Sequence, residues 1–174
     1  MRITIGGNPG TGTSTLGKAL AEALQYPFVS GGDIFRAMAK EKGLTLAEFG
    51  HLAESDKSYD IELDKRLKET GENAENIVIE SRLAGYMVSN ADLRILLFAS
   101  PECRAARIAE REGISYDVSY AQTIAREASE AKRYMDYYSI DINDQSIYDL
   151  IISSETFGIE ELFSVAETAA KKLL

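Results

Sequence analysis

The residues with the clearest chemical purpose lie near the start of the chain, where residues 7–15 read GNPGTGTST. Gly7 and Gly12 stand five positions apart and are followed by Thr13 and Ser14, which is the spacing of a phosphate-binding P-loop. Glycines let backbone N–H groups converge on phosphate oxygens, and a helix N-terminus adds partial positive charge. The run predicts a phosphate site formed by Gly7, Asn8, Pro9, Gly10, Thr11, Gly12, Thr13, Ser14 and Thr15.

Three positions bear on metal binding and catalysis. Ser14 stands where a P-loop hydroxyl reaches Mg²⁺, but Thr13 replaces the lysine that usually meets the β- and γ-phosphates. The alternative interpretation of the loop is a tight strand-to-helix turn in an ordinary α/β domain. Glu80 directly follows the apolar run 77–79, so we expect it to hold a Mg²⁺-bound water; the alternative is a carboxylate that caps a neighbouring helix.

Arginines recur at helical spacing on both sides of a polar connector at 113–118. The two groups are Arg104, Arg107 and Arg111 before the connector, and Arg126 and Arg133, with Glu130 between them, after it. Arginine forks bind phosphoryl oxygens bidentately, so the groups predict a mobile lid over the phosphates that also excludes water. The alternative is a pair of solvated, salt-bridged helices.

Arg36 and Arg82 form a second basic pair near predicted strand ends, where a phosphorylated ligand could lie opposite the P-loop. For Arg36 the alternative is a surface ion pair with Asp33 or Glu48.

The elements that must position these residues alternate between strand and helix. Strands are expected from residue 2 and at 26–29, 77–79, 93–98 and 150–152; helices are expected after the P-loop and at 34–42, from 45, 59–70, 101–112, 119–138 and 159–174. Asp33 is expected to cap the helix at 34–42. This alternation predicts one α/β domain over 1–174 with a parallel sheet, a helical insertion at 31–75 and a lid at about 104–133.

Composition narrows the possible partners and surroundings. The chain of 174 residues has a net charge of −9, which argues against nucleic acid or an anionic membrane as the main partner. No apolar run approaches the ~20 residues that span a bilayer, and a single cysteine fits a reducing cytoplasm. We therefore expect a cytoplasmic protein, most simply a monomer, that binds small molecules.

Together these residues resemble a nucleoside monophosphate kinase, and more closely an archaeal-type cytidylate kinase. The resemblance is carried by GGNPGTGTST at 6–15, GGDIFRAMAKEKG at 31–43, IESRLAGYM at 79–87, AERE at 109–112 and AREASEAKRYMDYYSIDINDQSIYDLII at 125–152. It extends over nearly the whole chain, and the final stretch is the most specific part.

The resemblance implies a P-loop NTPase-type, three-layer fold with a five-stranded parallel sheet and helices on both faces. It also implies transfer of the ATP γ-phosphate, with Mg²⁺, to CMP or dCMP by direct in-line attack. By position, residues 7–15 would bind ATP, Arg36 and Arg82 the acceptor phosphate, and Arg107, Arg111 and Arg133 the group in transfer; Asp33, Arg126 and Glu130 are further candidates for binding the acceptor. A lid arginine would replace the P-loop lysine, so loss of Arg107 or Arg111 should lower kcat far more than ATP affinity.

The sequence is also compatible with other functions. The acceptor could be AMP, UMP or shikimate, or Thr13 could mark a nucleotide sensor without catalysis. A P-loop GTPase is disfavoured, because no Asn-Lys-x-Asp sequence is present.

Overall fold

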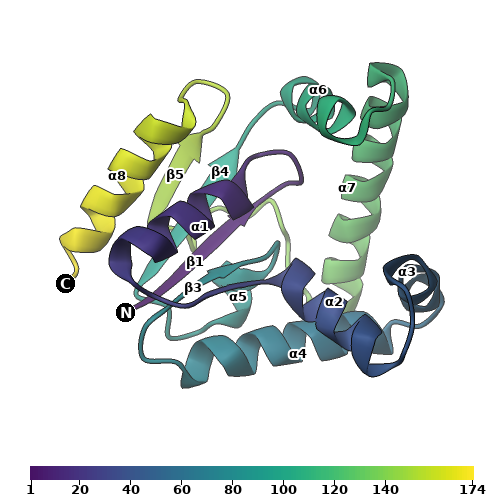
Figure 1. The fold of residues 1–174 in the computed structure, drawn as a ribbon, viewed down its shortest axis with the longest axis horizontal. Coiled ribbons are helices and arrows are strands. Elements are labelled where there is room, and N and C mark those ends of the chain that lie inside the picture. Colours follow the sequence, from purple (N-terminus) through teal and green to yellow (C-terminus); the bar gives the residue numbers. More distant parts are fainter.

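A computed structural model describes the backbone of residues 1–174 and all side chains except those at positions 46, 47 and 54 (Figure 1). The elements in chain order are β1 (Arg2–Gly7), α1 (Thr13–Leu24), β2 (Phe28–Ser30), α2 (Gly31–Glu41), α3 (Leu46–Ser55), α4 (Ser58–Asn73), β3 (Ile77–Glu80), α5 (Ala84–Met87), β4 (Leu93–Phe98), α6 (Pro101–Glu112), α7 (Tyr116–Tyr138), β5 (Leu150–Ser153) and α8 (Ile159–Lys171). Among the described residues, no helix is both long and apolar enough to cross a bilayer.

The strands form one parallel sheet in the order β2-β3-β1-β4-β5. Ile5 of β1 is in register with Glu80 of β3, and Gly7 with Leu97 of β4. The carboxyl ends of β1 and β3 are therefore adjacent, which brings the P-loop next to Glu80, and ligands of such sheets bind at this edge. The predicted five-stranded parallel sheet is confirmed.

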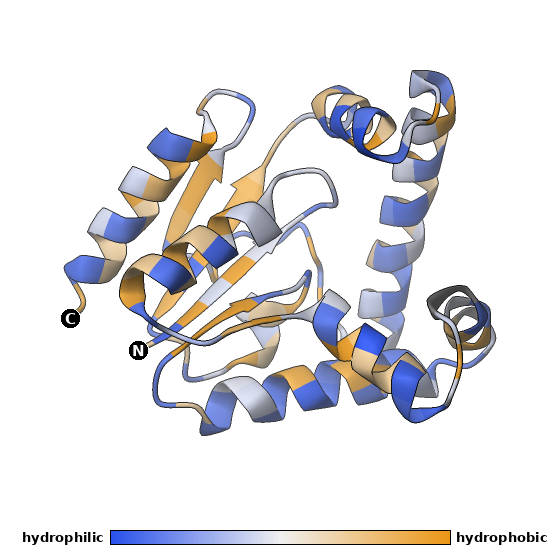
Figure 2. Ribbon diagram, in the orientation of Figure 1, coloured by the Kyte–Doolittle hydropathy of each residue, from blue (hydrophilic) through white to orange (hydrophobic). Residues whose placement is uncertain are grey.

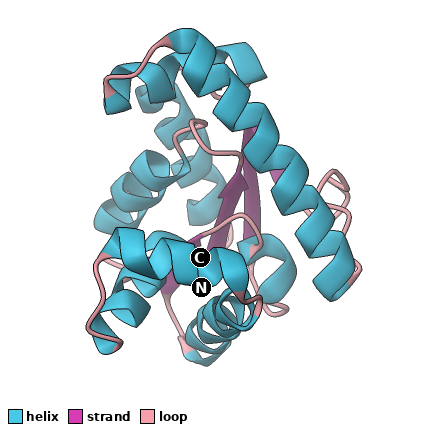
Figure 3. Cartoon of the chain, turned by 90° about the vertical axis from the view of Figure 1, so that its right-hand side faces the viewer, coloured by secondary structure: helices cyan, strands magenta, loops and turns pink.

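Helices cover both faces of the sheet, as Figure 3 shows from the side. The larger core joins α1 and α8 to the sheet, and the smaller core lies between β3, α4 and α5. Figure 2 shows the strands mostly in hydrophobic colours and α1 and α8 with alternating bands. This pattern is expected, because a strand covered on both faces is apolar throughout, whereas each surface helix buries one stripe.

The three helices between β2 and β3 form a separate helical group with a small core of its own. Met38, Ala39 and Phe49 are buried there, and Phe49 packs edge-on against Tyr59 with ring centroids 5.3 Å apart. A capping box between Thr45 and Glu48 begins α3, in agreement with the helix predicted from 45. This group corresponds to the predicted insertion at 31–75.

Two local predictions were wrong, and one short helix was not predicted. The N-cap of α2 is Ser30, and Asp33 is the third helical residue, whose carboxylate accepts from Ser30 in a capping box. The helix α7 begins at Tyr116 instead of residue 119, because Ser115 caps it by accepting from the N–H of Val118, and this shortens the connector. The short helix α5 was not predicted, since a single turn has too few residues to show a period.

Helices α6 and α7 form a hairpin beside the P-loop. Ser100 and Pro101 begin α6, and Gly113, at a φ of 68°, ends it, as predicted. The buried hydroxyl of Ser119 donates to the Ala105 carbonyl at 2.7 Å and joins the two helices. From this contact α7 runs toward α4 along the side of the molecule opposite the two termini (Figure 1).

Candidate active site

The loop after β1 has the backbone geometry of an anion site. Gly10 and Gly12 have φ angles of 89° and 90°, which residues with a Cβ rarely adopt. The loop is closed by a hydrogen bond of 3.1 Å from the N–H of Thr11 to the Asn8 carbonyl. Gly12 is the N-cap of α1 and supplies no side-chain cap, so the N–H groups of the first helical turn are available to a ligand.

Glu80 lies against the two hydroxyls that begin α1. Thr13 Oγ1 donates to its Oε1 at 2.8 Å, and Ser14 Oγ donates to its Oε2 at 3.1 Å. The arrangement agrees with the predicted closeness of Ser14 and Glu80. Hydroxyl and carboxylate oxygens at a phosphate site are the ligand types that Mg²⁺ prefers.

A cavity of about 400 Å³, here called the P-loop cleft, opens over this loop. Its lining residues are Gly7, Pro9, Gly10, Gly12, Thr13, Ser14, Thr15, Glu80, Arg82, Arg107, Arg111 and Arg126. Seven of the nine predicted loop residues are in this lining. The side chains of the other two, Asn8 and Thr11, shape the loop: Thr11 is buried and its hydroxyl donates to the Asn8 carbonyl at 2.7 Å.

The second cavity, of about 450 Å³, lies between the helical group and α7 and is here called the helical pocket. Its lining residues are Gly31, Gly32, Phe35, Arg36, Asp60, Leu63, Glu80, Ser81, Arg82, Arg126, Glu130, Arg133 and Tyr134. Such a volume suits a small-molecule ligand. Glu80, Arg82 and Arg126 line both cavities, so the two sites meet at these side chains.

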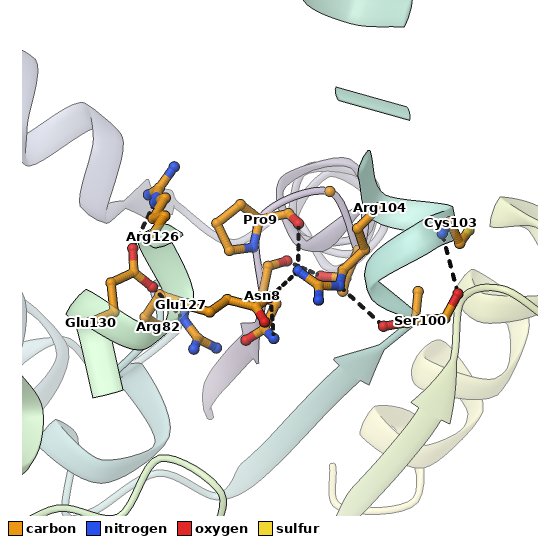
Figure 4. A network of polar contacts seen from close by, with 12 residues as sticks. Asn8, Pro9, Arg82, Ser100, Cys103, Arg104, Arg126, Glu127 and Glu130 are labelled. Carbon is orange, nitrogen blue, oxygen red and sulfur yellow. Dashed lines mark hydrogen bonds and ion pairs between the residues drawn. The ribbon is translucent and has the colours of Figure 1, made fainter. Parts of the chain in front are cut away.

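Glu130 holds the two shared arginines in place, as Figure 4 shows. Its buried carboxylate accepts from Arg82 Nε at 2.9 Å and from Arg126 Nε at 2.7 Å. The terminal nitrogens of both guanidiniums make no hydrogen bond to any described residue. Each arginine therefore keeps its fork of donors for a ligand, which matches the geometry of a phosphoryl group.

The remaining charged side chains of the helical pocket are Arg36, Asp60 and Arg133. Arg36 pairs with Asp33 at 2.5 Å, one of the alternatives raised from the sequence, and it also lines the pocket. The Ser30 hydroxyl lowers the pKa of Asp33, and Arg36 lowers it further. Burial raises the pKa of Asp60, which Arg133 opposes from 3.4 Å.

The sequence is similar to those of known proteins over nearly its whole length. Residues 2–156 match the cytidylate kinase-like family. The chain belongs to this family. The "Cytidylate kinase" of Methanocorpusculum labreanum is 56% identical over 174 residues, covering 100% of this chain and 98% of the relative. Those of Methanococcoides burtonii and Archaeoglobus fulgidus are 53% and 46% identical and cover 98% and 95% of this chain, and 98% and 92% of their own lengths.

Solved structures show the same fold at much lower identity. A shikimate kinase from Bacteroides thetaiotaomicron superposes with a TM-score of 0.64 at 17% identity, covering 98% of each chain. A gluconokinase from Sinorhizobium meliloti gives 0.64 at 16% identity, covering 99% of this chain and 92% of its own. These similarities confirm a P-loop kinase fold and, at this identity, carry no argument about the substrate.

Within this member of the cytidylate kinase-like family, the arginines of α6 have different surroundings. Arg104 is buried, donates to the carbonyls of Ala99 and Pro9, and pairs with Glu127 (Figure 4). Arg107 lines the P-loop cleft while donating to Ser154 Oγ at 3.1 Å and to the Gly10 carbonyl at 3.3 Å.

Three further predicted site residues differ in their distance from the two cavities. Arg111 is exposed at the edge of the P-loop cleft and pairs with Glu112. Arg133 lines the helical pocket and is not in the lining of the P-loop cleft. Asp33 is in neither lining, because its carboxylate is held by Ser30 and Arg36.

Sequence reasoning missed several residues of the site. Glu127 accepts from Asn8 Nδ2 at 2.9 Å and so fixes the P-loop to α7. Asp60, Phe35 and Tyr134 line the helical pocket, and the buried Ser154 binds Arg107. Asp60 follows Tyr59 at the start of a predicted helix, but no spacing signal in the chain joins it to α7.

Proposed function

We propose that this chain transfers the γ-phosphoryl group of ATP to CMP, and to dCMP as a related acceptor, acting as a monomer in the cytoplasm. One observation carries the proposal: two cavities, one at a P-loop and one among inserted helices, meet at two arginines with free donor forks. Full-length relatives that are cytidylate kinases supply the acceptor class. A nucleotide sensor would not need a second cavity joined to the first in this way.

The P-loop cleft is the donor site in this proposal. The N–H groups at the start of α1 and the backbone between Gly7 and Gly12 would bind the ATP phosphates. Ser14 and Glu80 would hold Mg²⁺, directly and through water, since their oxygens already lie 3.1 Å apart beside the loop. When bound, this ion neutralises charge on the phosphoryl oxygens.

The helical pocket is the acceptor site. Arg36 and Arg82 would bind the CMP phosphate and aim one of its oxygens at the γ-phosphorus. That oxygen forms the new P–O bond while the bond to the β-phosphate oxygen breaks and ADP leaves. The acceptor phosphate attacks as an anion, so no covalent enzyme intermediate and no general base is required.

Arg82 and Arg126 stand where the transferred group must pass, because both line the two cavities. Their terminal nitrogens would neutralise the phosphate charge that a P-loop lysine neutralises in other P-loop proteins. Glu130 would orient both guanidiniums, since it binds each of them through Nε. Arg107 and Arg111 would also neutralise phosphate charge, because both line the P-loop cleft, the proposed donor site. Arg133, which the resemblance assigns to the group in transfer, lines the helical pocket and not the P-loop cleft, so its proposed role is to bind the acceptor.

A coupled ADP-release assay with ATP–Mg²⁺ and each of CMP, dCMP, UMP, AMP and GMP tests the activity. We expect the highest kcat/KM with CMP or dCMP. ATP binding without turnover on any acceptor would contradict the kinase and favour the sensor. Arg82→Ala should raise KM for CMP and lower kcat while ATP affinity stays within a few-fold of the unchanged protein.

A further inference from the structure

The helical pocket has two chemically different ends. Glu80 and Arg82 mark the end that it shares with the P-loop cleft, and Arg126 lies between this end and the other. Phe35, Asp60 and Arg133 also line an adjoining outer cavity of about 600 Å³ and are absent from the lining of the P-loop cleft. A nucleotide whose phosphate lies at the first end therefore extends its base toward the second.

The polar pair at this second end has unused hydrogen-bonding capacity. Arg133 Nε lies 3.4 Å from Asp60 Oδ2, and it is buried without a hydrogen bond to the described residues. The Asp60 carboxylate likewise accepts no hydrogen bond from any described side chain or N–H group, although it is partly withdrawn from water and its pKa is raised by burial. Buried polar atoms in native proteins nearly always have partners, so the unpaired Arg133 Nε beside this carboxylate points to a ligand.

We infer that Asp60 and Arg133 read the Watson–Crick edge of cytosine at the base end of the helical pocket. The Asp60 carboxylate accepts from the exocyclic N4 amino group, and the Arg133 guanidinium donates to N3 and O2. These pairings follow the donor and acceptor pattern of the cytosine edge. Phe35 and Tyr134 line the same pocket and offer aromatic surfaces for the ring.

This pair separates cytosine from uracil by repulsion as well as attraction. Uracil presents a carbonyl oxygen where cytosine has N4, and an N–H where cytosine has the N3 acceptor. The carboxylate would then face an acceptor and the guanidinium a donor, and both groups would stay unpaired in a desolvated site. Adenine offers the same amino and ring-nitrogen pair but lacks O2, the third contact.

The test uses unchanged protein and an acceptor without the amino group, the ribonucleoside monophosphate of 2-pyrimidinone. We expect kcat/KM for this analogue and for UMP to be about 100-fold below that for CMP, in keeping with a site built around a substrate polar group. Asp60→Ala should lower kcat/KM for CMP and bring CMP and the analogue to within about threefold of each other. Equal use of CMP and the analogue by the unchanged protein would overturn the inference without any variant.

Asp64→Asn is the matched control. Asp64 is a buried carboxylate one helical turn after Asp60, but it binds the Tyr138 hydroxyl at 2.8 Å and lines neither the helical pocket nor the P-loop cleft. Its replacement should leave the CMP-to-analogue ratio unchanged. A change in this ratio as large in Asp64→Asn as in Asp60→Ala would assign the effect to general disturbance of α4 and overturn the inference.

The inference rests on the proposed acceptor site, and Arg36→Ala separates the two failures. A raised KM for CMP in Arg36→Ala, with an unchanged CMP-to-analogue ratio in Asp60→Ala, would keep the acceptor site and reject the role of Asp60. An unchanged KM in both Arg36→Ala and Arg82→Ala would reject the acceptor site itself, and the inference with it.

Discussion

The arginines of α6 and those of α7 have similar spacing in the sequence and different surroundings in the structure. On α6, Arg104 is buried and Arg107 donates to carbonyl and hydroxyl oxygens of the protein. On α7, Arg126 binds a carboxylate through Nε and leaves its terminal nitrogens to two cavities. A periodic arginine is therefore either fully held by protein oxygens or left with free donor groups, according to what its helix packs against.

The two helices differ because they pack against different parts of the molecule. The start of α6 lies against the P-loop, whose carbonyls of Pro9 and Gly10 need donors. α7 passes from the P-loop toward the helical group (Figure 1). The helical pocket and the outer cavity lie along this part of the helix. On α7, Glu127 pairs with Arg104 of α6, whereas Glu130 accepts from Arg126 of its own helix and from Arg82.

The strongest test of this comparison is Arg126→Ala. We expect kcat for CMP to fall about 10³-fold with little change in ATP affinity, because an arginine that neutralises charge in phosphoryl transfer typically contributes this much. Steady-state kinetics and ATP titration measure the two quantities. Lys132→Ala, an exposed cation on the same helix that pairs with Asp136, should change kcat less than twofold. An unchanged kcat in Arg126→Ala would return the transfer role to Arg107 and Arg111.

The converse test is Arg104→Met, which removes a buried anchor. We expect the free energy of unfolding to fall by about 3 kcal/mol, since Glu127 would lose its charge partner and the Pro9 and Ala99 carbonyls would lose a donor. Denaturant unfolding measures the loss. Arg104→Met combined with Glu127→Gln should recover part of it, because glutamine can still accept from Asn8. A loss in kcat without a loss in stability would contradict the structural role.

A smaller effect, which depends on pH, is expected at the contact between α4 and α7. Burial raises the pKa of Asp64 to about 6, against the opposing effect of the Tyr138 hydrogen bond. The folded state then holds the proton more tightly than the unfolded state, so stability from this group is present below pH ~4 and is lost as pH rises through about 6. Asp64→Asn should be about 2 kcal/mol more stable than the unchanged protein at pH 8 and equally stable near pH 4. An equal difference at both pH values would show that ionisation is not the cause.

The smallest effect concerns the start of α7. Ser115→Ala removes the cap on the Val118 N–H and should cost about 1 kcal/mol of unfolding free energy. Because Arg126 lies about three turns further along the helix, kcat should change less than twofold. Thermal unfolding measures the change in stability, and the ADP-release assay measures kcat. A large loss in kcat would show that the position of Arg126 depends on the α6–α7 turn.

The sequence was sufficient for the order of the elements other than α5 and for the geometry of the loop at 7–15. Residues 7–15 form a P-loop by local means, since glycine torsions and a helix N-terminus need no distant partner. The apolar run at 77–79 and the run at 93–98, which is apolar except for Arg94, identify two strands from their own composition. Helix ends were predicted correctly at 101 and 112. They were wrong at Ser30 and Ser115, because a second polar residue that can also cap a helix, Asp33 or Ser119, follows within about one turn.

Only the tertiary structure decided how each arginine is used. Glu130 lies 48 residues from Arg82, and Glu127 lies 119 residues from Asn8, so their pairing depends on where α7 crosses the sheet edge. The meeting of Asp60 with Arg133 likewise depends on packing between α4 and α7. Spacing along one helix fixes which side chains share a face. Whether that face meets a carbonyl, a carboxylate or a cavity is set by distant chain segments, because charge and hydrogen bonding act through space.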